Sequence, residues 1–254
     1  MADLIVQSFQ QAINLLTSGN PEIYATVYRT IYVAGVGALL ACVWSIPIAV
    51  LIGLYNFKGK WAVKGFFNAL IGIPTVALGL LMYLLLSRQG EFGSLHLLYT
   101  LNGIALGDAL LVSPLIISFT ANALGTADTQ LRDLARTLGA SGLRTNLKLI
   151  RETMWSMILS ITAAFNRGFG ELGIATLVGA SLLGNGTIFS GTRVLTTAIA
   201  LETNFGRFDV AMAYGIILMA IVIALALTLS LIERLREEDG LHVKLTFWRG
   251  LGGS

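Results

Sequence analysis

Long apolar stretches alternate with short polar segments along most of this chain of 254 residues. A bilayer core about 30 Å thick is crossed by roughly 20 consecutive apolar residues of α-helix, so each stretch of that length predicts one transmembrane helix. Five stretches are long enough, which predicts an all-α, polytopic membrane protein with five transmembrane helices. They cover residues 27–55, 66–86, 101–124, 153–178 and 210–232.

The segment that precedes the first stretch has a different pattern. Between residues 4 and 17, apolar side chains recur at helical spacing with glutamines between them, and the segment is too short to cross a bilayer. This pattern predicts an amphipathic helix that lies at the membrane interface and ends at the Ser-Gly-Asn-Pro cluster of residues 18–21. A sixth span is the alternative, and the small number of apolar residues argues against it.

The composition supports a membrane protein and excludes several other classes. Hydrophobic residues make up 55% of the chain and charged residues 12%, with a mean hydropathy of +0.76. A soluble domain carries about a quarter charged residues, so an aqueous enzyme or a nucleic-acid-binding protein is excluded. Cys42 is the single cysteine, so no disulfide can form within the chain.

The basic residues are distributed unevenly between the two sides of the predicted spans. The side reached after the first, third and fifth spans carries Lys58, Lys60, Lys64, Arg132, Arg136, Arg144, Lys148, Arg151, Arg234, Arg236, Lys244 and Arg249; the other side carries Arg29, Arg88, Arg193 and Arg207. The positive-inside rule therefore places the N-terminus outside. The predicted divisions are an extracytoplasmic interfacial segment (1–26), a transmembrane domain (27–233) and a cytoplasmic tail (234–254).

The loop between the third and fourth spans contains two predicted short helices. Asp128 can cap a helix whose apolar residues are spaced i, i+3, i+4 and i+7, and Gly139 is a natural residue to end it. A second helix could begin after Ser141. The spacing is compatible with a basic loop on anionic lipid headgroups and also with a helix that docks on a partner.

Four polar side chains interrupt the apolar spans: Asp108 in the third, and Asn166, Arg167 and Glu171 in the fourth. A charge inside the membrane is costly unless it is paired or faces water, so each is a functional candidate. Arg167 and Glu171 are four residues apart and could pair with each other, which would join helices. Alternatively Arg167 lies near the path of an anion, with Asp108 as its partner or as a cap.

The chain lacks the motifs of a nucleotide-hydrolysing or metal-dependent enzyme. It contains no G-x-x-x-x-G-K-[ST] motif, and no H-E-x-x-H motif; His96 and His242 are far apart in sequence. Residues 168–173 formally match G-x-G-x-x-G, but they lie in a predicted membrane helix and not after a strand. We interpret these glycines as close helix contacts, and we expect no cofactor, no metal and no catalytic residue in this chain.

The loop motif resembles a known family signature. Residues 133–140 (Asp-Leu-Ala-Arg-Thr-Leu-Gly-Ala) are similar to the "EAA" segment of ABC-importer permeases, with Asp133 in place of the usual Glu and Leu134 in place of the first Ala. In that family the segment forms a cytoplasmic coupling helix that docks on a separate ATPase. The resemblance therefore implies ATPase contacts for Asp133, Ala135, Arg136, Leu138, Gly139 and Ala140.

Two further segments resemble permeases for oxyanions. Residues 165–173 are similar to the Phe-x-Arg-x-x-Gly-Glu-x-Gly segment of molybdate- and sulfate-type permeases, and residues 191–203 to the outer Thr-Arg-Val-Leu-Thr-Thr-Ala-Ile segment of tungstate-type permeases. The resemblance covers about residues 28–233. It implies that Arg167, Asn166, Glu171 and Asp108 lie along the substrate pathway.

The resemblance implies a permease of the bacterial or archaeal cytoplasmic membrane that imports an oxyanion, tungstate first. It would work as a homodimer with two ATPase subunits, which would bind ATP and Mg²⁺, and with an extracytoplasmic oxyanion-binding protein. Molybdate and sulfate are alternative substrates. A secondary transporter or channel without an ATPase is the alternative class, but it predicts inverted repeats and leaves the loop motif unexplained.

Overall fold

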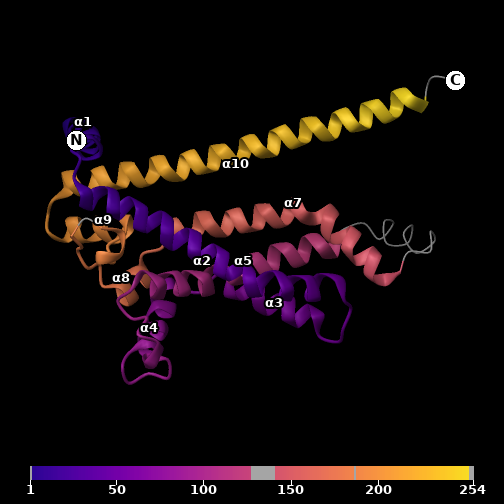
Figure 1. Cartoon of the computed structure of the whole chain (residues 1–254), viewed down its shortest axis with the longest axis horizontal. Helices are drawn as coiled ribbons and strands as arrows, with labels where there is room; N and C mark the ends of the chain where they lie inside the picture. Colours follow the sequence, from indigo (N-terminus) through magenta and orange to yellow (C-terminus); the bar gives the residue numbers. More distant parts are fainter. Residues whose placement is uncertain (1, 127–140, 186, 252–254) are drawn as a thin grey trace.

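The computed structural model describes residues 2–126, 141–185 and 187–251, and every regular element within these ranges is helical (Figure 1). The expectation of an all-α protein is therefore confirmed for this part of the chain. The helices are α1 (Ala2–Thr17), α2 (Pro21–Leu54), α3 (Lys60–Leu70), α4 (Thr75–Leu86), η1 (Gly93–Leu95), α5 (Leu101–Thr126), α7 (Gly142–Phe169), α8 (Gly173–Gly179), η2 (Ile188–Ser190), α9 (Leu195–Asn204) and α10 (Phe208–Leu251).

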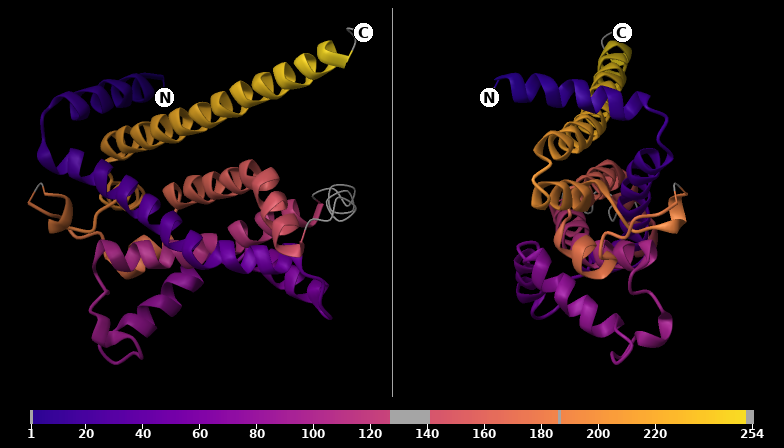
Figure 2. Two further views of the ribbon diagram at one scale, coloured as in Figure 1. Left: turned by 45° about the vertical axis from the view of Figure 1, so that its right-hand side comes forward. Right: turned by 90° about the vertical axis from the view of Figure 1, so that its left-hand side faces the viewer.

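The predicted N-terminal helix is present as α1, and it packs on the start of α10 (Figure 2). Ala12 is buried against a cluster that includes Ala213 and Tyr214, whereas Phe9 and Ile13 are more than half exposed. The chain then turns into α2, whose N-terminus is capped by the side chain of Asn20. A membrane interface would cover the exposed apolar side chains of α1, so its interfacial position stays a prediction.

The core lies around α5, which packs between α2, α7 and α8. Of its most apolar stretch, 83% is buried inside the protein, against 33% for α2. Small residues make this close packing possible. A Cβ added to Gly37 would lie 3.0 Å from the Cβ of Asp108, and one added to Gly107 would lie 2.5 Å from Ile174. Close helix contacts at small residues are thus present along α5.

The second predicted span, 66–86, is wrong as a single helix. The structure has two helices here, α3 and α4, which are bent by 94° at a break over residues 71–74. Pro74 lacks an amide hydrogen and disfavours helical geometry at Ile73, which favours a break here, although Pro47 and Pro114 lie inside the continuous helices α2 and α5. The two helices together are apolar enough to predict one span, because the hydropathy of a segment does not show where its helix bends.

The fourth predicted span, 153–178, is also wrong as a single helix. α7 begins at Gly142 and ends at Phe169, and the short α8 begins after a break at residues 170–172. Glycines at 168, 170 and 173 weaken helix propagation here. The break matters for function because it falls among the polar residues expected to lie along the substrate pathway.

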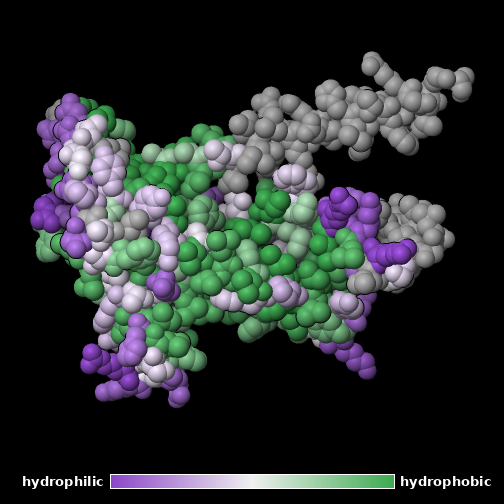
Figure 3. Space-filling model, viewed as in Figure 1, coloured by the Kyte–Doolittle hydropathy of each residue, from purple (hydrophilic) through white to green (hydrophobic). Residues whose placement is uncertain are grey.

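Within the described residues, α2, α5 and residues 208–228 of α10 are long and apolar enough to cross a bilayer, and the bent α3–α4 pair could be a fourth span. The count of five and the orientation remain predictions. Figure 3 shows an apolar surface over the middle of the helices, with polar side chains gathered toward the ends of the molecule. α10 runs on to Leu251, a length of about 66 Å, past the predicted start of the tail at 234.

Candidate functional site

The breaks in two helices meet around Arg167, in the last turn of α7. Its Nη2 donates a hydrogen bond of 3.1 Å to the carbonyl oxygen of Ile71, in the break between α3 and α4. We call the segments 71–74 and 170–172, together with Asn166 and Arg167, the double break. A broken helix exposes backbone carbonyls that have no partner within the helix, and a guanidinium is a suitable donor to them.

The double break keeps several donors and acceptors available. The hydrogen bond to Ile71 uses one of the five N–H donors of Arg167, and no further partner of this side chain occurs among the described residues. The neighbouring Asn166 has a buried Oδ1 without a hydrogen-bond partner in the same part of the chain. The unused N–H groups of Arg167 and the side-chain NH₂ group of Asn166 can donate to an oxyanion, whereas the unpaired Asn166 Oδ1 is an acceptor and cannot.

The predicted pair between Arg167 and Glu171 does not form. The helix that would place them on one face ends at Phe169, and Glu171 turns to the next helix, where its Oε1 accepts a 2.9 Å hydrogen bond from the amide of Ile174. Glu171 is only 5% exposed. The i, i+4 spacing therefore predicted a contact that requires a continuous helix, and the break removes it.

Asp108 lies in the middle of α5 and neither pairs with Arg167 nor caps a helix end. It is 2% exposed, and its Oδ1 has no hydrogen-bond partner among the described residues. It lines a small cavity together with Glu171, Thr30 of α2 and Thr196 of α9. The structure thus brings Asp108 and Glu171 together on one side of the α7 terminus, while Arg167 binds on another.

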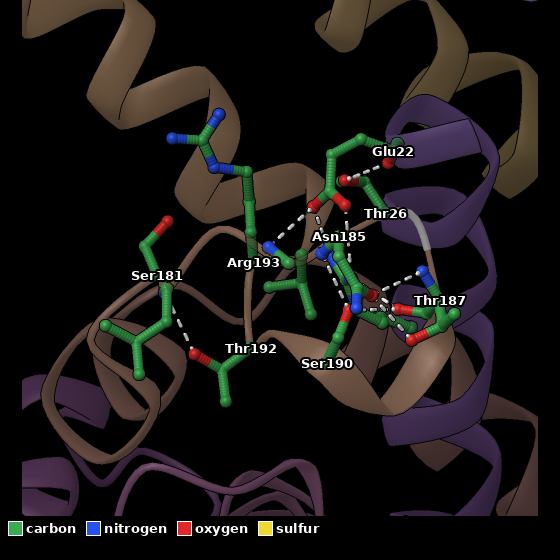
Figure 4. Close-up of polar contacts among 12 residues, drawn as sticks. Glu22, Thr26, Ser181, Asn185, Thr187, Ser190, Thr192 and Arg193 are labelled. Carbon is green, nitrogen blue, oxygen red and sulfur yellow. Dashed lines mark hydrogen bonds and ion pairs between the residues drawn. The ribbon is translucent and has the colours of Figure 1, made fainter. Parts of the chain in front are cut away.

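A second polar cluster lies at the end of the molecule that carries α9 (Figure 4). The guanidinium of Arg29, fully buried in α2, lies 2.6 Å from the carboxylate of Glu22 and donates a 2.7 Å hydrogen bond to the carbonyl oxygen of Thr187. Glu22 also accepts a 3.3 Å hydrogen bond from the amide of Gly184. This ion pair therefore fastens the loop between α8 and α9 to the first turns of α2.

Glu202 of α9 joins two further arginines of the same cluster. Its carboxylate lies 3.6 Å from Arg193, which is 7% exposed, and 2.5 Å from Arg207. The hydrogen bond to Glu202 raises the pKa of the Arg207 guanidinium. We call the set of Glu22, Arg29, Arg193, Glu202 and Arg207 the α9-end network. Each arginine in it faces a carboxylate.

Threonine hydroxyls connect the α9-end network to the double break. The amide of Leu195, the first residue of α9, donates to Thr30 Oγ1 at 2.9 Å, and Thr196 Oγ1 donates to the carbonyl oxygen of Glu171 at 2.7 Å. In the preceding loop, Thr192 Oγ1 donates to the carbonyl oxygen of Gly179. The segment that resembles tungstate-type permeases thus binds both α2 and the α7–α8 break.

The structure adds residues to those expected from the sequence and leaves others outside its description. Glu22, Arg29, Thr30 and Thr196 were not site candidates; Arg29 counted only toward topology. Glu22 and Arg29 are seven residues apart, but their contacts with Gly184 and Thr187, and the contact of Thr30 with Leu195, join segments that are distant in the sequence. A buried arginine near a span end was the one available signal. The expected ATPase contacts, Asp133, Ala135, Arg136, Leu138, Gly139 and Ala140, all lie outside the described residues.

The arrangement of helices is that of ABC-importer permeases. A chain of the MetNI methionine ABC transporter, solved in inward-facing conformations, matches with a TM-score of 0.64 and 19% identity over 82% of this chain and 93% of that chain. A bacterial ABC transporter involved in alginate import matches with a TM-score of 0.62 and 18% identity over 89% of this chain and 83% of that one. Identities this low establish the fold alone.

Residues 45–235 match the binding-protein-dependent transport system inner membrane components, and the chain belongs to this family. It is 30% identical to the tungstate uptake system permease protein TupB of Peptoclostridium acidaminophilum, over 93% of this chain and 100% of that protein. The Campylobacter jejuni protein of the same name is 31% identical over 88% and 91% of the two chains. The molybdate/tungstate permease WtpB of Pyrococcus furiosus is 26% identical over 63% and 61%. The chain is therefore an ABC-importer permease.

Proposed function

We propose that this permease imports tungstate. The observation that carries the proposal is that two proteins named as tungstate uptake permeases match at 30% and 31% identity over 93% and 88% of this chain. The segment 191–203 resembles tungstate-type permeases. Hydrogen bonds hold this segment to α2 and to the α7–α8 break. Molybdate is the second candidate because a molybdate/tungstate permease is also a relative.

The double break is the proposed contact for the anion. Tungstate is a tetrahedral dianion that requires hydrogen-bond donors and a compensating positive charge. Arg167 supplies both, with four N–H donors beyond the one bound to Ile71, and the amide of Asn166 adds another donor group. The α9-end network is the poorer candidate because its arginines already face carboxylates. A weak site suits transport because tight binding in the pathway would stop release.

We propose that two copies of this chain form the pathway and that residues 133–140 couple it to two ATPase subunits. The ATPases would bind ATP and Mg²⁺ and carry out hydrolysis, and an extracytoplasmic binding protein would deliver the oxyanion. The α9 end would then face outward, in accord with the positive-inside rule. A pathway formed by one copy would leave the exposed apolar side chains of α2 and α10 to lipid alone.

Co-purification tests the coupling role. Gly139→Trp, which places a bulky residue at the predicted helix corner, should release the ATPase from the permease. Gly65→Trp is the matched control, since a Cβ at Gly65 of α3 would point into open space. Retention of the ATPase by the Gly139→Trp variant at the level of the control would contradict the docking role.

Stimulated ATP hydrolysis tests the substrate. The complete complex should be reconstituted in liposomes with its binding protein. Its rate of ATP hydrolysis should be highest with tungstate, lower with molybdate and lowest with sulfate. Equal stimulation by sulfate would contradict the tungstate assignment. Anion transport without any associated ATPase would instead favour the secondary-transporter class.

A further inference from the structure

The cavity between α2, α5, α9 and the α7–α8 break is small. It measures about 10 Å³, and Thr30, Asp108, Glu171 and Thr196 supply its polar lining. A volume of this size accommodates one water molecule and is far too small for a tetrahedral oxyanion. The cavity is therefore distinct from a place where the transported anion could bind.

Two carboxyl groups share this cavity without a cation to balance them. Charged and titratable groups on the other elements packed against α5 either have other partners or lie far along their helices from Asp108. The helix α8 has no such group. Arg29 binds Glu22 and Thr187, and Arg167 binds the carbonyl of Ile71. The remaining ones are Tyr24, Tyr28, Tyr32 and Cys42 of α2, Tyr83 of α4, Lys60 and Lys64 of α3, and the exposed Arg144, Lys148, Arg151 and Glu152 in the first half of α7; the Tyr32 hydroxyl donates to Asn102 of α5.

The hydroxyl groups that line the cavity cannot donate to either carboxylate. Thr30 Oγ1 already donates to the carbonyl oxygen of Thr26 at 2.8 Å, and Thr196 Oγ1 donates to the carbonyl oxygen of Glu171 at 2.7 Å. A hydroxyl has one proton to donate, so both donors are used. An ionised carboxylate at Asp108 would thus be buried with an unpaired charge beside a second carboxylate, at a cost of several kcal/mol.

The two carboxyl groups are not equivalent. Glu171 receives a hydrogen bond of 2.9 Å from the amide of Ile174, which stabilises a negative charge on it. Asp108 receives none among the described residues, and its Oδ1 has no partner. When two acids compete for one charge, the one with the hydrogen-bond donor keeps the charge and the other keeps the proton.

We propose that Asp108 holds a proton at neutral pH and that the cavity is a proton-binding site. The Asp108 hydroxyl donates into the cavity, toward Glu171 or a single water molecule between them. This hydrogen bond links α5 to the α7–α8 break. This site does not depend on which anion the permease transports.

The test is infrared difference spectroscopy on the assembled complex in lipid at neutral pH. A protonated carboxylic acid has a carbonyl stretch above the amide I band, and the wild-type protein should show it. Asp108→Asn should remove this band, whereas Asp209→Asn, a matched change at an exposed carboxylate at the start of α10, should leave it. Asp108→Glu, which keeps an acid but moves it, should shift the band.

Absence of the band from the wild-type spectrum at neutral pH would overturn the proposal without any variant. A band that persists unchanged in both Asp108→Asn and Asp108→Glu would also overturn it, because another group would then carry the proton. Raising the pH should remove the wild-type band reversibly. The spectrum is measured without transport, so failure of the tungstate assignment would leave the proton site standing.

Discussion

The α9-end network and the double break both hold arginine side chains, but the two regions give them different partners. In the network, Arg29, Arg193 and Arg207 each face a carboxylate of Glu22 or Glu202, although the buried Nε of Arg193 has no hydrogen-bond partner among the described residues. At the double break, Arg167 has a single backbone partner and Asn166 has an acceptor without one. An arginine that faces a carboxylate has its charge balanced within the protein, whereas an arginine that faces none can bind an anion. The difference assigns structure to one region and transport to the other.

The largest expected effect comes from breaking the network at its most buried arginine. Arg29→Ala should lower the free energy of unfolding by about 3–5 kcal/mol, because it leaves Glu22 and the Thr187 carbonyl without their partner in a largely buried place. Equilibrium unfolding in mixed micelles measures the loss. The double variant Glu22→Gln, Arg29→Met removes both charges and should cost less than Arg29→Ala alone. A double variant that is less stable would contradict this account.

A smaller effect should follow from filling the close contact between α4 and α8. A Cβ at Gly173 would lie 2.7 Å from the backbone nitrogen of Val76, and backbone cannot move aside as a side chain can. Gly173→Ala should therefore lower the free energy of unfolding by about 1–3 kcal/mol. Gly65→Ala, where a Cβ meets open space in α3, is the control and should gain up to about 1 kcal/mol. Equal changes in the free energy of unfolding for Gly173→Ala and Gly65→Ala would contradict the close approach of α8 to α4 at Gly173.

The smallest effect should come from an ion pair that lies on the surface. Lys148 and Glu152 of α7 are 3.3 Å apart, and their side chains are 58% and 52% exposed. Lys148→Ala should change the free energy of unfolding by about 0.5 kcal/mol or less, because water already solvates both charges. The same unfolding experiment measures it. If Lys148→Ala lowered the free energy of unfolding as much as Arg29→Ala does, burial would not explain the difference between the buried and the exposed ion pair.

The sequence predicted the helices better than the breaks between them. The third span was expected over 101–124 and is observed as Leu101–Thr126, because an apolar helix buried on all sides leaves a clear signal. The bend between α3 and α4 has a local signal in the sequence, Pro74, which disfavours a straight helix. The end of α7 at Phe169 had only glycines, which fit a close helix contact equally well.

The polar contacts of the site were less predictable than the helices. The spacing of Arg167 and Glu171 allowed a pair as one of two alternatives, but Glu171 accepts from the amide of Ile174 and Arg167 donates to the carbonyl of Ile71, 96 residues away in sequence. Arg29 and Thr187 are 158 residues apart. Such contacts depend on how distant helices pack, which hydropathy and spacing do not determine.

Transport by the Arg167→Ala variant tests the central claim most directly. Uptake of labelled tungstate into proteoliposomes should be measured for the complete complex with its binding protein, beside Arg167→Lys. We expect Arg167→Ala to reduce the uptake rate by about tenfold or more, with assembly and ATPase docking intact, since a charge-assisted hydrogen bond contributes about 1.5–3 kcal/mol. The contrary result is that Arg167→Ala reduces the amount of assembled complex, while the complex that does assemble takes up tungstate at the wild-type rate. Arg167 would then be a structural residue, and the account would be contradicted.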